Sequence, residues 1–334
     1  MTSVMNRRTF LCGLTLGMLS TPVAGEAEQT ARACRLGYLS SIPIPLHGRT
    51  HLMEAFEQGL REMGFTPGMN LTIELRSPRS WIQDDEHLRR LAAEMIDRRF
   101  DVIVAAWNPA IAAVKRTVAN TPVVMIGAVD PVGNGFVSST VRPGANMTGL
   151  MWDIGFAKQF DIWKEIVPRL FRVAVLQDPT WGWGKEYWKG AEVTATARGF
   201  KLLPFDIRRE DDFEAAFQKL AQEHSDAIFL SDSPLFWRQN NVILNFARTS
   251  HLPVMASSKG YVKKGALISY GAEIRALFRQ AAVYVSKILN GVDPGTLAVE
   301  RSVIIELAVN VITAKTLGLT IPSSLLQWAD EVIR

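Results

Sequence analysis

Cysteine is almost absent from this chain. Its 334 residues contain two cysteines, Cys12 and Cys34, and Cys12 falls in a segment that has the pattern of a removable leader. A mature chain with one thiol cannot form an internal disulfide. It also cannot supply the cluster of thiolates on which many structural zinc sites are built. We therefore expect neither a disulfide framework nor a metal centre that depends on cysteine.

A surplus of charge is also missing. The 37 basic and 33 acidic residues give a formal net charge of +4. Outside the leader, the pair Lys263 and Lys264 is not a run dense enough to follow a phosphate backbone. Nucleic acid is therefore not an expected partner. After the N-terminal segment no apolar run is long enough to span a bilayer, so we expect no stable membrane insertion once that segment is removed.

Signatures of catalysis and of cofactor binding are scarce. The sequence has no G-x-S-x-G elbow, no P-loop and no G-x-G-x-x-G. His47 and His51 lie four residues apart, but no glutamate completes an H-E-x-x-H motif and no third ligand is apparent. Cys34 has no evident histidine partner. The sequence thus disfavours an enzyme, and it predicts no catalytic residue, no cofactor and no metal.

Residues 1–30 have the order of an export signal. Arg7 and Arg8 precede an apolar stretch over 11–19 and a small-residue segment over 21–27, which is the order found in signal peptides. The apolar stretch is too short for a permanent anchor. We expect a cleaved signal peptide and a periplasmic protein. The adjacent arginines resemble a twin-arginine leader, so export by the Tat and Sec routes both remain open.

Two arrays of alternating strand-like and amphipathic segments follow the leader. In the first, strand-like residues 35–39 and 101–106 alternate with helical patterns, and a similar array begins near residue 173. Such alternation is typical of βαβ units with a parallel sheet. The chain length suits two domains. We predict an α/β fold of two doubly wound, Rossmann-like lobes joined by hinge strands.

The lobe boundaries are predicted from the same pattern. Lobe 1 is expected over residues 35–149 plus about 273–295, and lobe 2 over 150–272 plus about 296–334. Residues 144–149 are the predicted crossover between them.

Ligands of doubly wound sheets bind beyond the carboxyl ends of the strands. Polar and aromatic residues that follow predicted strands are therefore the candidate ligand-binding residues. They are Ser40, Trp107, Asn108, Pro109, Asp130, Asn146, Thr148, Asp178, Trp181, Trp183, Asp232 and Ser257.

For several of these residues, a purely structural role explains the sequence as well as ligand binding does. Asn108 either caps a helix whose free N–H groups hold a ligand carboxylate, or it serves as a cap alone. Asp130 either receives a ligand amine or forms an Asx turn. Asp232 either caps the next helix or receives an ammonium group. Trp181 and Trp183 either stack on a flat ligand or pack in a hinge or lid.

Many segments resemble the family of ABC-transporter substrate-binding proteins that includes tryptophan and tyrosine uptake proteins. The segments are 35–40 (RLGYLS), 56–73, 101–105 (DVIVA), 130–133 (DPVG), 142–149 (RPGANMTG), 172–176, 211–217, 269–271, 287–291 and 314–322. They follow one another in order over essentially the whole mature chain.

The resemblance implies a type I periplasmic binding protein fold, in which lobe closure traps a ligand. It implies an extracytoplasmic solute-binding component of an ABC importer, with a small organic ligand and an ABC permease as partners. An amino acid or an aromatic or carboxylate compound is expected in the interlobe cleft. Trp107 and Asn108 stand where family members commonly carry a small residue and threonine, and Trp181 and Trp183 replace what is often an Asn-Pro loop. These departures point away from an ordinary amino acid, for instance to an aromatic carboxylate.

Two other classes of function remain open. A ligand sensor would present its closed form to a membrane signalling receptor, and a neighbouring gene for a kinase rather than a permease would indicate it. An exported enzyme could use Asp130 and Asp232 as two carboxylates with separated pKa values. Turnover of a bound ligand would identify the enzyme.

Overall fold

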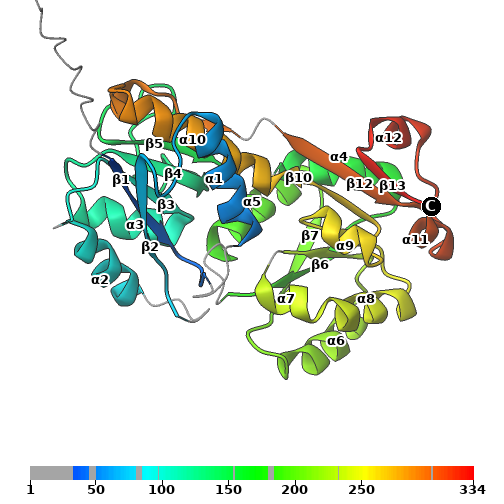
Figure 1. Ribbon diagram of the computed structural model, residues 1–334. Coiled ribbons are helices and arrows are strands. Elements are labelled where there is room, and N and C mark those ends of the chain that lie inside the picture. Colours follow the sequence, from blue (N-terminus) through cyan, green and yellow to red (C-terminus); the bar gives the residue numbers. More distant parts are fainter. Residues whose placement is uncertain are drawn as a thin grey trace, which may run out of the picture. The chain divides into compact units, whose positions relative to one another are not determined.

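The computed structural model describes residues 33–44, 50–79, 85–96, 98–152, 155–179, 184–231, 233–301 and 304–334. The predicted signal peptide lies outside them. The described segments form two β-sheets with flanking helices (Figure 1). None of the helices in these segments is long and apolar enough to cross a membrane.

The first sheet has six strands in the order β11-β5-β4-β3-β1-β2, and its pairings are parallel. The strands are β1 (Cys34–Ser40), β2 (Leu71–Arg76), β3 (Val102–Ala106), β4 (Val123–Ala128), β5 (Met147–Met151) and β11 (Glu300–Arg301). The helices packed on this sheet are α1 (His51–Glu62), α2 (Asp85–Ile96), α3 (Asn108–Thr117) and α10 (Ile274–Leu289).

Alternate residues of the first sheet enter two hydrophobic cores. In β3, Val102 and Val104 pack with residues of α1 and α10, whereas Ile103 and Ala105 pack with residues of α2 and α3. This alternation follows from the two-residue period of a strand. Both faces of the sheet are therefore covered, which explains why β3 is apolar throughout.

The second sheet has seven strands in the order β13-β12-β10-β9-β8-β6-β7. The strands are β6 (Arg172–Gln177), β7 (Lys201–Asp206), β8 (Ala227–Leu230), β9 (Val254–Ala256), β10 (Ile268–Ala272), β12 (Ile305–Asn310) and β13 (Glu331–Ile333). The pairing of β10 with β12 is antiparallel, and the other pairings of this sheet are parallel.

The remaining helices follow β5 along the chain. They are α4 (Phe156–Ile166), α5 (Gly184–Ala197), α6 (Asp212–Gln222), α7 (Pro234–Arg238), α8 (Asn240–Thr249), α9 (Lys259–Lys263), η1 (Pro294–Thr296), α11 (Val311–Thr316) and α12 (Ser323–Trp328). The predicted α/β class with two parallel-dominated sheets is confirmed.

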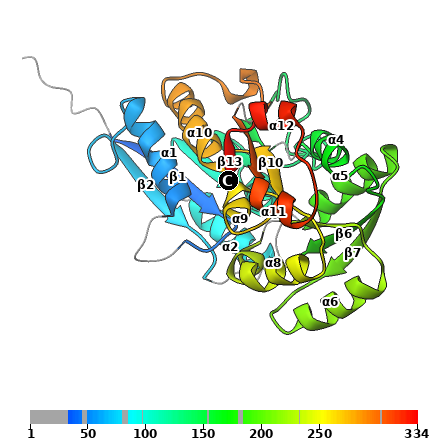
Figure 2. The same ribbon diagram turned by 90° about the vertical axis from the view of Figure 1, so that its right-hand side faces the viewer.

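The chain passes between the sheets at three places. It leaves the first sheet after β5, returns after β10 through α10, and leaves again between β11 and β12. In both Figures 1 and 2 the orange α10 lies beside α1 although more than 200 residues separate them along the chain. The numerical lobe boundaries given above stay a prediction.

Two segments differ from the sequence-based expectation. The crossover predicted over 144–149 overlaps strand β5. Gly149 has a φ of +136°, and a Cβ there would lie 2.2 Å from the carbonyl oxygen of Met125, so this glycine permits close strand pairing rather than a turn. The apolar pattern over 236–248 predicts a single helix, whereas the structure divides this segment into α7 and α8.

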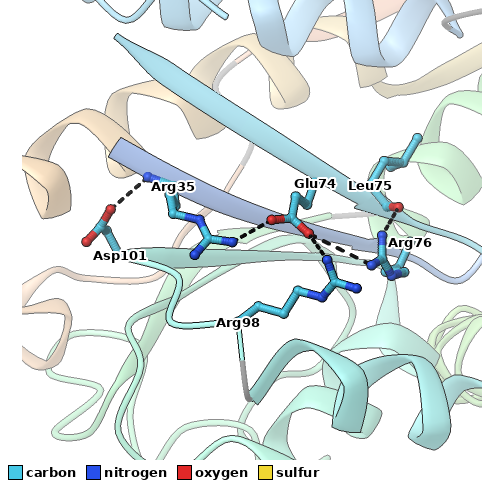
Figure 3. A network of polar contacts seen from close by, with 6 residues as sticks. All are labelled: Arg35, Glu74, Leu75, Arg76, Arg98 and Asp101. Atoms are coloured by element: carbon cyan, nitrogen blue, oxygen red, sulfur yellow. Dashed lines mark hydrogen bonds and ion pairs between the residues drawn. The ribbon is translucent and has the colours of Figure 1, made fainter. Parts of the chain in front are cut away.

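The outer strand β2 is fixed by a charge network around Glu74 (Figure 3). Its carboxylate accepts hydrogen bonds from Arg35 at 2.6 Å and Arg98 at 2.9 Å, and Arg76 lies 3.8 Å away. The backbone N–H of Arg35 donates to Asp101 at 2.7 Å. The Arg35 hydrogen bond is the main cause that lowers the pKa of Glu74. The network ties β1, β2 and the segment before β3 together.

Candidate functional site

A cavity of about 580 Å³ is lined by residues from both halves of the chain. The first half contributes Ile42, His51, Leu52 and Trp107. The second contributes Ser233, Pro234, Trp237, Arg238, Ser257, Ser258, Lys259, Ser269, Gly271, Ala272, Glu273, Ile274, Arg275 and Glu306. The segments after β1, β3, β8 and β9 meet here, as expected for the carboxyl ends of parallel strands. The volume suits a small organic molecule.

Trp107, a predicted site residue, lines the cavity with little exposed surface. Its side chain is only 2% exposed, and it packs against Trp152 and Phe278 with ring centroids 6.0 and 5.6 Å away. Its φ is +73°, which is uncommon for a bulky residue and marks a strained backbone. A Cβ on Gly127 would lie 2.2 Å from the indole, so the absence of a side chain there makes room for the ring.

Ser257, a second predicted site residue, also lines the cavity. Its Oγ is buried and has no hydrogen-bond partner among the described residues. A buried hydroxyl without a partner is costly. A polar ligand group in the cavity could satisfy it.

An ion pair between Lys259 and Glu306 forms part of the cavity wall. The Lys259 Nζ lies 2.6 Å from the Glu306 Oε1. Lys259 begins α9 and Glu306 lies on β12. The hydrogen bond to Glu306 raises the pKa of Lys259 above its ordinary value, so this amine is charged at neutral pH. The pair offers a ligand one cationic and one anionic group side by side.

Further charged groups surround this pair. The Glu273 carboxylate accepts hydrogen bonds from the backbone N–H groups of Arg275 and Ala276 at 3.0 and 2.6 Å, which caps α10. Arg275 places a cation in the first turn of that helix, where the helix dipole disfavours positive charge. With Arg238, the lining contains more cationic than anionic side chains. This balance favours a ligand that carries a carboxylate.

Ser40 and Asn108 are predicted site residues whose polar atoms bond to the backbone. The Ser40 Oγ donates to the carbonyl of Ile42 and accepts from its N–H. The Asn108 amide accepts from the N–H of Val129 at 2.9 Å and donates to its carbonyl at 3.0 Å. Asn108 therefore joins the ends of β3 and β4 and does not cap α3, whose N-cap is Trp107.

Asn146 and Thr148 have comparable internal partners. The Asn146 Nδ2 donates to the carbonyl of Thr121 at 2.8 Å, and the Thr148 Oγ1 donates to the carbonyl of Leu297 at 2.7 Å. The Thr148 bond joins β5 to the segment that precedes β11. Ligand contact by either residue stays a prediction.

Among the predicted residues that the structure describes, Asp130, Pro109 and Asp178 also do not line this cavity. Asp130 is exposed, and its Oδ1 accepts from the N–H of Gly133, three residues on, at 3.0 Å, so this carboxylate bonds within its own loop. Pro109 is half-buried in α3, and Asp178 is buried after β6. The residues Trp181, Trp183, Asp232 and His47 lie outside the described segments.

Apart from Trp107 and Ser257, the lining residues named above were missed by sequence reasoning, and three of them matter most for ligand binding. Trp237 lies in the short helix α7, Lys259 two residues after Ser257, and Glu306 on β12. The position of Lys259 just beyond a strand was a usable signal. No sequence signal indicated Glu306, because β12 was not predicted as a strand that pairs antiparallel with β10.

The described segments contain no group of three or more His, Cys, Asp or Glu side chains that could hold a metal ion. Within the cavity the acidic lining residues are Glu273 and Glu306, and each is engaged by a donor described above.

Known proteins resemble this chain over most of its length. A family model described as "ABC transporter substrate binding protein" matches residues 42–333. A tyrosine-binding protein of Clostridioides difficile (strain R20291) is 21% identical over 266 residues, 80% of this chain and 76% of the relative.

Solved structures have the same fold. The ABC domain from Streptococcus pneumoniae in complex with L-Trp has a TM-score of 0.76 at 20% identity, and the match covers 90% of this chain and 99% of that one. The leucine-binding protein LivK of Thermotoga maritima has a TM-score of 0.57 at 13% identity, covering 76% and 82% of the two chains. The fold is that of type I periplasmic binding proteins. Because the family model spans nearly all of the described chain, the protein belongs to the ABC transporter substrate-binding protein family.

Proposed function

We propose that this protein captures an amino acid or an aromatic carboxylate in the 580 Å³ cavity and delivers it to an ABC permease. Family membership supports the binding role. The relatives named above, a tyrosine-binding protein and a domain in complex with L-Trp, support this ligand class.

The observation that carries the proposal is the composition of the cavity wall. Lys259 and Glu306 place opposite charges 2.6 Å apart, and the same wall contains the indoles of Trp107 and Trp237. An α-amino acid has a carboxylate and an ammonium group on one carbon, so it can pair with both charged side chains. An aromatic carboxylate can use the cation and an indole. Charge-assisted hydrogen bonds are the stronger kind in such sites.

The protein acts in this proposal by binding without turnover. Closure of the two halves around the ligand would give the permease a shape to recognise, which requires contacts that differ between the open and closed states. Residues 1–30 would direct the protein to the periplasm, with Tat export suggested by Arg7 and Arg8.

A thermal-shift and calorimetry panel tests the proposal. The mature chain is titrated with L-tryptophan, L-tyrosine, L-leucine and 4-hydroxybenzoate. A true ligand present at about 100 times its Kd should add roughly 2.7 kcal/mol to the free energy of unfolding. Mass spectrometry of the recovered ligand should show it unchanged. Conversion of the ligand, or a flat response to the whole panel, would contradict the proposal.

A further inference from the structure

We propose that Trp237 is the specificity-determining residue of this cavity and selects ligands with a flat π-electron system. The inference rests on the proposed function, because it assigns a role within the same binding site. Trp237 lies in α7 and is 45% exposed while it lines the cavity. The side chain of Trp107, by contrast, is almost completely buried by its packing contacts.

The indole of Trp237 is held in place from outside the cavity. Tyr261 meets it edge to face with ring centroids 5.2 Å apart, and the Lys264 Nζ lies 5.5 Å from its centroid. A Cβ on Gly260 would lie 2.8 Å from the indole Cη2, so the ring packs directly on the backbone there. None of these three residues lines the cavity. The ring is therefore supported on one side and accessible from the other.

A preorganised ring of this kind favours aromatic ligands. Apolar surface exposed in a cavity gains free energy when a ligand covers it. Stacked or edge-to-face aromatic pairs add about 0.5–1.5 kcal/mol beyond burial of area, equivalent to about a 2- to 10-fold gain in affinity. Because the supporting residues already fix the ring, little side-chain entropy is lost on binding.

Helix α9 connects the ring with the charged group of the site. Its first residue, Lys259, forms the ion pair with Glu306, and the next two, Gly260 and Tyr261, support the indole of Trp237. One short segment thus positions a cation and an aromatic surface in the same cavity. A ligand that combines a planar ring with a carboxylate matches both.

Trp237→Leu tests the inference, and Trp328→Leu is the matched control. Trp328 is also 45% exposed and also has a lysine ammonium, that of Lys158, 4.9 Å from its ring, but it does not line the cavity. Calorimetry with L-tryptophan and with L-leucine gives the affinities of wild type and both variants. We expect Trp237→Leu to lose about 5- to 10-fold in L-tryptophan affinity, with less than a 2-fold change for L-leucine. Trp328→Leu should leave both affinities unchanged.

A second variant displaces the ring without removing it. Gly260→Ala should push the indole of Trp237 from its support and should also lower L-tryptophan affinity selectively. This variant decides the question if Trp237→Leu does not fold, as checked by circular dichroism.

Failure of the inference about Trp237 can be distinguished from failure of the proposed function. If Trp237→Leu and Gly260→Ala both retain the wild-type affinity for L-tryptophan, or lose affinity equally for L-tryptophan and L-leucine, the role of Trp237 is overturned and the proposed function still stands. A wild-type protein that binds L-leucine but not L-tryptophan overturns the inference in the same way. A wild-type protein that binds no member of the panel overturns both.

Discussion

The Lys259 ammonium and the Glu306 carboxylate lie 2.6 Å apart at the wall of a cavity that also contains two tryptophans. Their side chains are 41% and 25% exposed. Ion pairs with this much contact with water contribute little to folding stability. Their place in the cavity therefore has more consequence for ligand binding than for the fold.

Lys259→Met should reduce affinity for the carboxylate ligand identified by the panel about 10-fold or more, because a charge-assisted hydrogen bond is lost. The free energy of unfolding should change by less than about 1 kcal/mol. Calorimetry and urea denaturation measure the two effects. Lys263→Met is the matched control, because Lys263 lies in the same helix, pairs with Glu331 at 2.9 Å and does not line the cavity. Equal affinities of the two variants would contradict the assignment of Lys259.

Trp107→Ala should destabilise the protein by about 3–5 kcal/mol, the usual cost of truncating a buried large aromatic side chain. The ring is 2% exposed and packs on Trp152, Phe278 and the backbone of Gly127. Alanine does not relieve the positive φ at this position. Urea denaturation gives the change.

Trp237→Ala serves as the comparison for Trp107→Ala, because Trp237 is 45% exposed and its truncation should cost much less stability. Similar losses in the two variants would show that Trp107 is not the more tightly packed ring.

Much of the fold followed from local patterns in the sequence. Strand β3 is buried on both faces, so its continuous apolar composition indicates a strand. Helix α1 buries one face, so the helical spacing of its apolar residues indicates a helix. β5 and β12 were harder to predict. Gly149 in β5 resembles a turn signal until its contact with Met125 is known, and the pairing of β12 with β10 depends on the whole topology.

The site was only partly predictable for a related reason. Rules about strand ends located Trp107 and Ser257. They also selected Asn108, whose amide hydrogen-bonds the backbone of Val129. A polar residue after a strand can serve a ligand or the neighbouring loop, and only the three-dimensional partner distinguishes these roles. Trp237 lies in a helix rather than at a strand end, so these rules did not select it.

Asn108→Ala should lower the free energy of unfolding by about 2 kcal/mol, because it leaves the N–H of Val129 without its partner and leaves the Val129 carbonyl with the Asn134 amide as its remaining side-chain donor. Urea denaturation measures this loss. Asn146→Ala serves as the comparison, because the short hydrogen bond of the Asn146 side chain is the one to the Thr121 carbonyl at 2.8 Å. This substitution should lower the free energy of unfolding by less than Asn108→Ala does. A loss of ligand affinity for Asn108→Ala without loss of stability would instead support the predicted ligand contact.

Glu74→Gln should destabilise the protein in a pH-dependent way. The pKa of Glu74 is lowered from its ordinary value of 4.5, mainly by the hydrogen bond from Arg35. A carboxyl with a lowered folded-state pKa contributes stability that is fully present above 4.5 and is lost as pH falls through the folded value. The difference between wild type and Glu74→Gln should therefore be largest near pH 7, on the order of 1 kcal/mol because solvent screens these groups, and should shrink on acidification.

Urea midpoints at pH 7 and pH 3 measure the difference for Glu74→Gln. Glu94→Gln is the control, because the Glu94 side chain is 56% exposed and pairs with one described arginine, Arg76, at 3.4 Å. The stability difference between wild type and Glu94→Gln at pH 7 should be smaller than that for Glu74→Gln. A wild-type advantage over Glu74→Gln that is the same at both pH values would contradict an origin in the ionised carboxylate. Its cause would then lie in packing or in neutral hydrogen bonds of β2, since those are present at either pH.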